Sequence, residues 1–312
     1  MPPLVSILIP CYNAESWLAD TLESALGQTW THREIIVVDD GSRDGSLAVA
    51  RRFEARGVRV IAQTNRGASA ARNAALAASR GDWLQFLDAD DLLAPEKIER
   101  QLALGATTGP EIVLSGTWAR FTGSVADARL DPQPLAIDAS PADWVVTKFE
   151  RNTMMHPAAW LVPRPLAERA GPWNESLSLD DDGEYFTRVV LAAQGVRCCA
   201  GAVSYYRSQL ANSLSRTKSD AAWSSAFRSL ELSVNGLLLR EDSPRTRQAC
   251  ANALQRLIYE AYPRAAPARA EAARRVALLG GSRLSPEGGP SFQRVRRLVG
   301  WRIAKRLQDW SR

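Results

Sequence analysis

The sequence predicts an α/β protein in which helices flank a mostly parallel, Rossmann-like sheet, with a helical C-terminal extension. Three observations support this prediction. Short β-branched runs alternate with helix-forming segments over the first hundred residues, the runs are continuously apolar, and strand-like runs end near Lys218. The chain has 312 residues, 46% of them hydrophobic, which is enough for a sizeable core.

Four apolar runs in the N-terminal part are expected to form strands: residues 4–10, 33–40, 58–63 and 81–91. The segments between them are expected to form helices: Ala14–Gly27, Ser46–Arg56 and Gly67–Ser79. Because the runs are apolar without interruption, we expect a parallel sheet that is covered on both faces.

The pattern is less regular from Glu111 onward. We expect two further strands, at residues 111–121 and 196–207, and a loop at 122–141. Helices are expected at 165–171 and 180–195, and three or four more after Lys218. This divides the chain into two regions: residues 1–217, with halves of about 1–105 and 106–217, and a basic helical extension at 218–312.

Polar side chains follow each of the four N-terminal strands. They are Tyr12 and Asn13, Asp39 and Asp40, Asn65 and Arg66, and Asp88 and Asp90. Ligands of such sheets bind beyond the carboxyl ends of the strands. The sequence therefore predicts a binding site at this edge.

The stretch FLDADDLL (Phe86–Leu93) ends an apolar run on three carboxylates. One interpretation is a solvated turn whose aspartate caps the next helix. The other is a cation site, because Asp88 and Asp90 should lie on one side of an extended chain while Asp91 turns away. Mg²⁺ typically takes one or two carboxylates and completes its shell with phosphate oxygens.

Two other stretches also allow a structural and a functional interpretation. VVDDGSRDGS (Val37–Ser46) is either a turn or a set of acceptors for base N–H and ribose hydroxyl groups. NRGASAARNAAL (residues 65–76) is either a capped surface helix or an anion site at a helix N-terminus. In the second case Arg72 pairs with phosphate or stacks on a base.

Four stretches, in this order, resemble the nucleotide-sugar half of glycosyltransferase family 2: VSILIPCYNAESWLADTLESALGQTW, EIIVVDDGSRDGS, NRGASAARNAAL and GDWLQFLDADDLL. The resemblance is strong over about residues 4–105 and looser to about 215. It implies the GT-A fold and an inverting glycosyltransferase that uses a nucleotide-sugar donor, with a UDP-linked sugar expected. Mg²⁺ or Mn²⁺ is the implied cofactor.

The resemblance also assigns residues on the donor side. The family's base and ribose contacts correspond to Pro10, Tyr12 and Asp40, and less closely to Asp39 and Arg72. Its Asp-x-Asp (DXD) motif corresponds to Asp88 and Asp90. Asp90 is expected to be the direct metal ligand, and Asp88 to serve both the metal and the donor.

A third acidic cluster, Asp180 to Asp182, begins a predicted helix. Acids often occupy the first helical turn because they complement the helix dipole. The resemblance instead implies a catalytic base for the acceptor hydroxyl, with Asp182 in the base position and Asp181 in place of the family's usual Glu. The dipole should lower the pKa of Asp182 and its neighbours should raise it, so the direction of the shift stays open.

Several departures from the family pattern restrict the function. A Gln-x-x-Arg-Trp motif, which processive synthases of the family carry, is missing, so we expect transfer of a single sugar to a hydroxyl acceptor. Gln209 stands near the position of a family histidine, and His156 is expected to be structural. The alternatives are a sugar-phosphate nucleotidyltransferase, although its N-terminal glycine-rich loop is missing, and an inactive sugar- or lipid-binding protein.

Charge is distributed unevenly. From Arg240 onward 16 Lys/Arg stand against 6 Asp/Glu, a net charge of +10 that leaves −5 on the preceding residues. Residues 291–312 show helical spacing of apolar side chains: Val295, Leu298, Val299, Ile303, Leu307 and Trp310. This helix either packs on the protein or lies in a membrane surface with Trp301 and Trp310 at the interface. Because the body is acidic, nucleic acid is not an expected partner.

The expected setting is the synthesis of cell-surface glycans or polysaccharides, with a glycan or a lipid-linked acceptor. We expect a cytoplasmic protein, because the N-terminus does not resemble a signal peptide and the four cysteines form no CxxC pair. If the tail binds membrane, the protein lies peripherally at the inner face.

Overall fold

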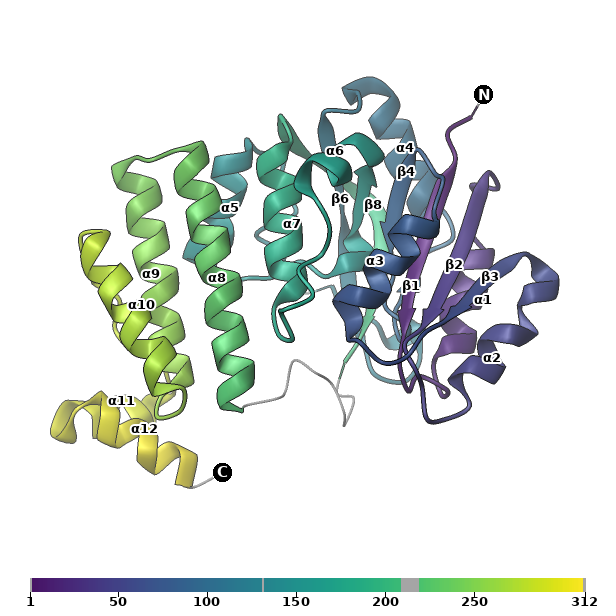
Figure 1. Ribbon diagram of the computed structural model, residues 1–312. Helices are drawn as coiled ribbons and strands as arrows, with labels where there is room; N and C mark the ends of the chain where they lie inside the picture. The colour runs from purple at the N-terminus through teal and green to yellow at the C-terminus, as the bar shows by residue number, and fades with distance from the viewer. Residues whose placement is uncertain (1, 131, 209–218, 311–312) are drawn as a thin grey trace.

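The computed structural model describes residues 2–130, 132–208 and 219–310. Figure 1 shows a sheet with helices on both faces in the N-terminal part of the chain, and an array of helices from the C-terminal part beside it. The sheet consists of eight strands: β1 (Val5–Cys11), β2 (Arg33–Asp39), β3 (Val58–Ala62), β4 (Trp83–Phe86), β5 (Leu92–Leu93), β6 (Ile112–Phe121), β7 (Trp160–Pro163) and β8 (Gly195–Arg207).

The strands are arranged in the order β3-β2-β1-β4-β7-β6-β8-β5. Strands β1 to β4 are parallel to one another, β7 is antiparallel to both β4 and β6, and β6 is parallel to β8. The two-residue strand β5 is antiparallel to β8. The N-terminal half of the sheet is thus purely parallel, and the carboxyl ends of β1, β2 and β4 share one edge.

The described residues contain twelve α-helices. They are α1 (Leu18–Leu26), α2 (Ser46–Arg52), α3 (Ala68–Ala78), α4 (Lys97–Thr108), α5 (Pro141–Arg151), α6 (Arg164–Ala170), α7 (Asp181–Ala192), α8 (Asp220–Arg240), α9 (Pro244–Ala261), α10 (Ala266–Leu278), α11 (Pro290–Val299) and α12 (Trp301–Trp310). Within this part of the chain, no helix combines the length and the apolar character needed to span a bilayer.

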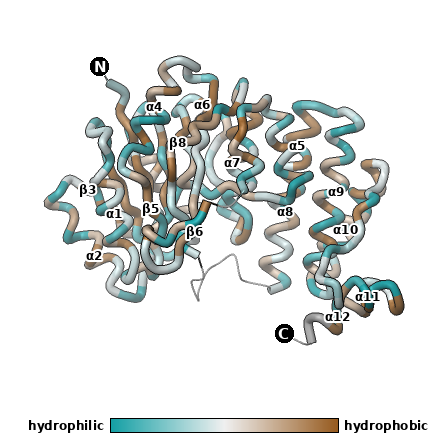
Figure 2. The backbone as a smooth tube through the Cα atoms, turned by 180° about the vertical axis from the view of Figure 1, so that it is seen from behind, coloured by the Kyte–Doolittle hydropathy of each residue, from teal (hydrophilic) through white to brown (hydrophobic). Residues whose placement is uncertain are grey.

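Apolar side chains of β1 alternate between the two faces of the sheet, which explains why helices cover both faces. Ile7 and Ile9 are buried on one face in a cluster with Leu22 of α1, and Leu8 is buried on the other with Ala71 of α3. Figure 2 shows hydrophobic residues concentrated along the strands. The α3-face cluster continues through α7 and α8 into α9 and α10. Helices α8 to α10 therefore share the core of the sheet.

The predicted fold class is confirmed, with some corrections. The fourth apolar run leaves the strand at Phe86, so residues 87–91 form a turn. The described residues after Lys218 form five helices, where three or four were expected, because Gly300 (φ 80°) divides the predicted tail helix into α11 and α12. Helices α4 and α5 and strands β5 and β7 were not predicted from the sequence.

The pairing of β6 with β8 depends on the absence of a side chain at Gly116. The register shifts between Gly116 and Thr117, and residues 200–202 of β8 bulge from the ladder. A Cβ atom on Gly116 would lie 2.2 Å from the carbonyl oxygen of Ala202. That distance is far shorter than van der Waals contact.

We predict that Gly116→Ala lowers the free energy of unfolding by about 1–3 kcal/mol, the usual effect of overpacking a buried site. Gly123→Ala is the matched control, because a Cβ there meets nothing within 4 Å. It should change stability by less than about 0.5 kcal/mol. Urea denaturation measures both variants, and equal effects would contradict the steric explanation.

Candidate active site

Polar loops meet at the carboxyl edge of the parallel strands, as predicted. The loop after β1 is tied to the loop after β2: the backbone N–H of Asn13 donates to Oγ of Ser42 at 3.0 Å, and the N–H of Arg43 donates to Oδ1 of Asn13 at 2.8 Å. Asn13 adopts a left-handed conformation with φ 50°, which asparagine tolerates. Tyr12 is left 46% exposed at this edge, while Pro10 is buried in β1.

The two aspartates after β2 have different surroundings. Asp40 accepts three hydrogen bonds, from Nε2 of Gln63 at 2.7 Å and from the backbone N–H groups of Arg66 at 2.9 Å and Gly67 at 2.8 Å. Oδ2 of Asp39 accepts from the N–H of Ser42 at 3.2 Å, whereas its buried Oδ1 has no hydrogen-bond partner among the described residues. Asp40 thus fixes the loop before α3, and Asp39 keeps an acceptor available.

Arg72 of α3 joins two acidic clusters that are far apart in the sequence. Its Nη2 lies 2.8 Å from Oδ1 of Asp88, and its Nη1 lies 2.8 Å from Oδ2 of Asp181. Its guanidinium carbon is 4.5 Å from the ring centroid of Trp173, and Asp181 also accepts from Oγ of Ser69 at 2.8 Å. Burial alone would lower the pKa of Arg72, but Asp88 and Asp181 outweigh it and raise that pKa.

The Asp-x-Asp turn is held by Arg207 at the end of β8. Nε of Arg207 donates to the carbonyl oxygen of Asp90 at 2.9 Å, and its backbone N–H donates to Oδ1 of Asp91 at 2.9 Å. The Arg207 guanidinium also lies over the ring of Trp17 at 4.5 Å. The pKa of Asp90 is raised to about 8, because burial and the carboxylates of Asp91 and Asp88 disfavour its ionised form.

Asp91 turns into the protein and contacts His156. Oδ2 of Asp91 lies 3.1 Å from Nδ1 of His156, and Oγ of Ser204 lies 2.8 Å from Nε2. This resembles a Ser-His-Asp arrangement, but all three residues are buried to 1% exposure or less, so that no substrate reaches them. Burial lowers the pKa of His156 to about 3, which keeps it neutral. The expectation that His156 is structural agrees with this geometry.

Asp182 lies in the first turn of α7, directly after Asp181. Its Oδ1 accepts from the backbone N–H of Gly183 at 2.8 Å. Burial, followed by the carboxylates of Asp181 and Asp180, raises its pKa to about 7. The question left open by the sequence is thereby answered: burial and like charge outweigh the helix dipole. Asp182 can therefore accept a proton near neutral pH.

The donor set at Asp88 and Asp90 suits a hard divalent cation. Both residues offer carboxylate oxygens, and burial together with the neighbouring carboxylates raises the pKa of Asp90, an effect that a bound cation would oppose. One oxygen of Asp88 is engaged by Arg72. Among the described residues no three His, Cys, Asp or Glu side chains gather into a metal site, so water and phosphate oxygens would have to complete the shell.

Sequence reasoning missed several residues that build this edge. No role was predicted for Arg207, Ser69, Gln63 or Trp173. Arg207 contacts Asp90 and Asp91, which are 117 and 116 positions away in the sequence. The other three contact partners more than 20 positions away, which the sequence does not reveal. Gln209 lies outside the described residues.

A partly parallel sheet with paired carboxylates at its carboxyl edge, faced by an acidic helix N-terminus, defines a GT-A glycosyltransferase. The chain belongs to glycosyl transferase family 2, whose family model matches residues 6–166. The predicted family and enzyme class are thus confirmed.

Relatives and solved structures agree with this assignment. The chain is 28% identical over 212 residues to the uncharacterized glycosyltransferase EpsJ of Bacillus subtilis, covering 66% of this chain and 62% of EpsJ. It is 30% identical over 205 residues to the succinoglycan biosynthesis protein ExoO of Rhizobium meliloti, covering 63% of this chain and 56% of ExoO. The chain spans less than two thirds of either relative.

The fold is also that of S. aureus TarS. The crystal structure of TarS 1–349 in complex with UDP-GlcNAc superposes with a TM-score of 0.72 at 18% identity, covering 99% of this chain and 92% of that one. The match extends through the C-terminal helices, which supports the GT-A fold with a helical C-terminal region.

We predict that Arg72→Met destabilises the protein by about 3–5 kcal/mol, because two partly buried carboxylates lose their counter-charge. Arg66→Met is the matched control: Arg66 is 60% exposed and pairs with Glu175 at 2.8 Å. Such a surface pair contributes about 0–1 kcal/mol. Urea denaturation at pH 7.5 compares them, and a loss at Arg72 no larger than at Arg66 would refute its bridging role.

Proposed function

We propose that the protein transfers a single sugar from a UDP-linked donor to a hydroxyl group, with inversion at the anomeric carbon and dependence on Mg²⁺ or Mn²⁺. One observation carries the proposal: Arg72 joins the Asp-x-Asp turn to the first turn of α7, where Asp182 has a pKa of about 7. The groups needed for a leaving diphosphate and for an attacking hydroxyl are thereby held in one assembly.

On the donor side we assign the nucleotide to the edge between β1 and β2. The exposed ring of Tyr12 can cover a base, and the unpartnered Oδ1 of Asp39 can accept from a base N–H or a ribose hydroxyl. Asp40 shapes the loop instead, since its carboxylate is occupied. The complex of TarS with UDP-GlcNAc supports a UDP-linked donor.

Asp90 and Asp88 would hold the cation. When bound, the cation supplies positive charge against the diphosphate that leaves the anomeric carbon. Arg72 keeps Asp88 oriented, and Arg207 fixes the turn through the carbonyl oxygen of Asp90. An ionised Asp90 is favoured only beside a positive charge, because its own surroundings raise its pKa.

We assign the role of base to Asp182. The acceptor oxygen attacks the anomeric carbon, the bond from that carbon to the diphosphate oxygen breaks, and the hydroxyl proton passes to the Asp182 carboxylate. A single displacement of this kind inverts the configuration. Asp181, the other candidate, is already paired with Arg72 and accepts from Ser69, so that it positions α7.

The acceptor is proposed to be a glycan or a lipid-linked sugar in the synthesis of a cell-surface polysaccharide. The similarity to ExoO, a succinoglycan biosynthesis protein, supports this class. We place the protein in the cytoplasm. A lipid-linked acceptor would have to reach the carboxyl edge of the sheet from a membrane surface.

Asp90→Ala is predicted to remove the metal dependence of nucleotide binding, because it removes the proposed direct ligand. Isothermal titration with UDP, in Mn²⁺ and in EDTA, measures this. The wild type should bind UDP more tightly with Mn²⁺, and the variant should show no difference. Asp127→Ala, an exposed control, should behave as wild type. If Asp90→Ala kept the full gain from Mn²⁺, the metal assignment would fail.

Asp182→Asn should leave UDP affinity unchanged and slow hydrolysis of UDP-sugars about 10²–10⁴-fold, the usual range for loss of a general base. At saturating Mn²⁺, kcat/KM of the wild type should be lost as pH falls through about 7, because Asp182 must be ionised to accept a proton. In the Asp182→Asn variant, kcat/KM should not show this decrease as the pH falls through about 7. A loss of less than about tenfold would place the base elsewhere.

Stability supplies the control for this variant. Because the pKa of Asp182 is raised in the folded state, its ionisation opposes folding once the pH exceeds the unfolded value. Asp182→Asn should therefore be at least as stable as wild type at pH 8, as measured by thermal unfolding. Lost activity then cannot be attributed to misfolding.

A further inference from the structure

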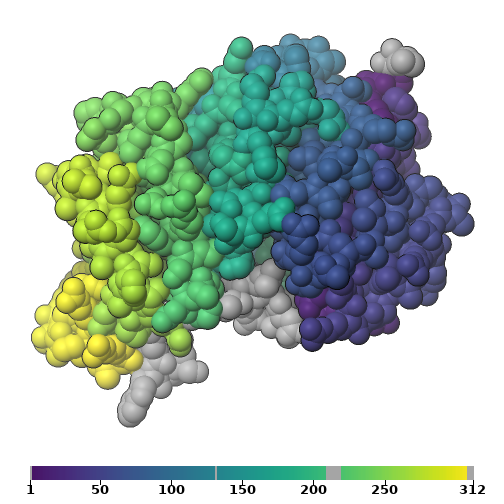
Figure 3. All heavy atoms as spheres, in the orientation of Figure 1, coloured from purple at the N-terminus to yellow at the C-terminus, as the bar shows by residue number. Residues whose placement is uncertain are grey.

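The C-terminal helices α11 and α12 form a basic surface that the proposed transfer reaction does not use. Residues 288–308 contain six Lys/Arg and no Asp or Glu. In Figure 3 this segment forms a protruding corner of the molecule, at the end remote from the N-terminal strands. We call residues 290–307 the tail surface.

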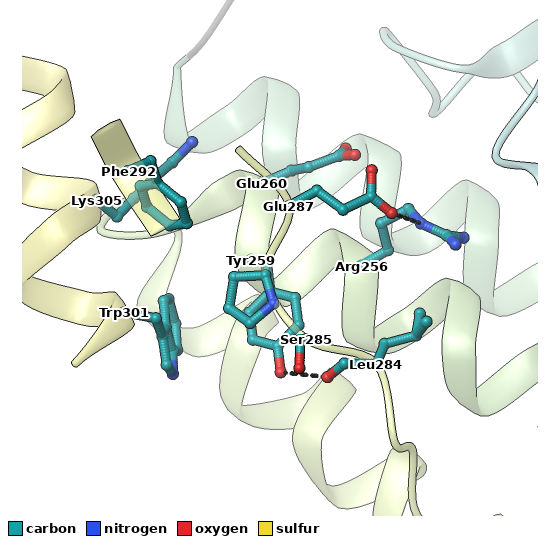
Figure 4. A pocket seen from close by; sticks show the side chains of 10 residues that line it. Arg256, Tyr259, Glu260, Leu284, Ser285, Glu287, Phe292, Trp301 and Lys305 are labelled. Atoms are coloured by element: carbon teal, nitrogen blue, oxygen red, sulfur yellow. Dashed lines mark hydrogen bonds and ion pairs between the residues drawn. The ribbon is translucent and has the colours of Figure 1, made fainter. Parts of the chain in front are cut away.

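One side of the tail surface is fastened to α9. Phe292 and Ala304 are 5% and 3% exposed, and the ring of Trp301 meets the rings of Tyr259 and Tyr262 at 4.9 and 5.0 Å. Figure 4 shows the pocket that these contacts leave. Its free volume of about 70 Å³ is far below the roughly 300–1,000 Å³ of small-molecule sites. The pocket is therefore a packing gap beside the anchor.

The opposite side of the tail surface stays uncovered. Leu298 is 85% exposed, Leu307 52%, Ile303 50% and Val299 45%. Four of the ten exposed large hydrophobic side chains of the described chain thus fall within ten consecutive residues. Exposed arginines accompany them: Arg294, Arg297, Arg302 and Arg306. Clustered exposed apolar groups indicate an interaction surface.

The charge of the tail surface indicates which kind of partner it binds. A second copy would bring like-charged arginines together across a symmetric contact, which opposes self-association. An anionic bilayer matches both features, since apolar side chains enter the acyl boundary while arginines reach the headgroups. We propose that the tail surface binds the face of an anionic lipid bilayer.

The placement of the site fits this proposal. In Figure 1, β1 runs downward from the N-terminus, so that the carboxyl edge faces the bottom of the view, where α11 and α12 also lie. A bilayer below the molecule would face the candidate active site. Presentation of a lipid-linked acceptor rests on the proposed function, whereas the binding of lipid does not.

Vesicle co-sedimentation of the full chain tests the proposal. The protein should sediment with vesicles of phosphatidylcholine and phosphatidylglycerol at 50 mM NaCl, and much less at 500 mM, because salt screens surface attraction. Pure phosphatidylcholine vesicles should bind weakly. If the intact chain does not bind the anionic vesicles at low salt, the proposal is wrong.

Matched variants locate the contact. Leu298→Ser with Ile303→Ser should abolish most of the binding, whereas Leu239→Ser with Leu278→Ser should retain it, although those two residues are 89% and 71% exposed on α8 and α10. Arg297→Gln with Arg302→Gln should weaken binding about 25-fold, at about fivefold per basic residue. Arg51→Gln with Arg52→Gln, on α2, is the control for charge.

Every variant should bind UDP and unfold as the wild type does, which separates loss of contact from loss of fold. Equal losses in the tail variants and their controls would overturn the assignment. The assignment would also be overturned if the wild type failed to bind vesicles and instead formed a dimer that was lost in the Leu298→Ser/Ile303→Ser variant. Analytical ultracentrifugation measures this. If UDP fails to bind but vesicles do, the proposed function falls and the membrane contact stands.

Discussion

The double ion pair of Arg72 with Asp88 and Asp181 is the contact on which the candidate site depends. Two acidic clusters, one at the end of β4 and one at the start of α7, approach each other in partly buried surroundings. Without a shared cation their carboxylates would repel, and the raised pKa values of Asp90 and Asp182 show that one arginine does not compensate all of them. The residual deficit of positive charge is what a substrate complex containing a cation can fill.

The loops around this contact are fixed by groups that do no chemistry. Asp40 accepts the backbone N–H groups that precede α3, and so sets the start of the helix that carries Arg72. His156 and Arg207 bind Asp91, which orients the neighbouring Asp90. Asp39, Asp90 and Asp182 thus each stand next to a structural aspartate in the sequence.

The sequence predicts the strands and the aspartates at their ends, but it does not predict which aspartate of a pair is structural. The strands β1 to β4 and the polar residues at their ends follow from local apolar pattern, which needs no knowledge of contacts. Which aspartate keeps a free oxygen depends on Gln63, Arg66 and Gly67, more than 20 residues from Asp40. The pair of Arg72 with Asp181 spans 109 positions. Strand β5 has only two residues, too few for a periodic signal.

The uneven charge of the chain connects the two proposals. An acidic edge repels the diphosphate of a nucleotide sugar, which is why the proposed donor site includes a cation. The same acidic body is repelled by an anionic membrane, while the tail surface, which has no acidic residue between positions 288 and 308, is attracted. A molecule with these opposite ends has a preferred orientation at a charged surface. Because the tail surface and the carboxyl edge lie on the same side, attachment through the tail surface would bring the site toward the lipid, while repulsion of the acidic edge would limit how closely it approaches.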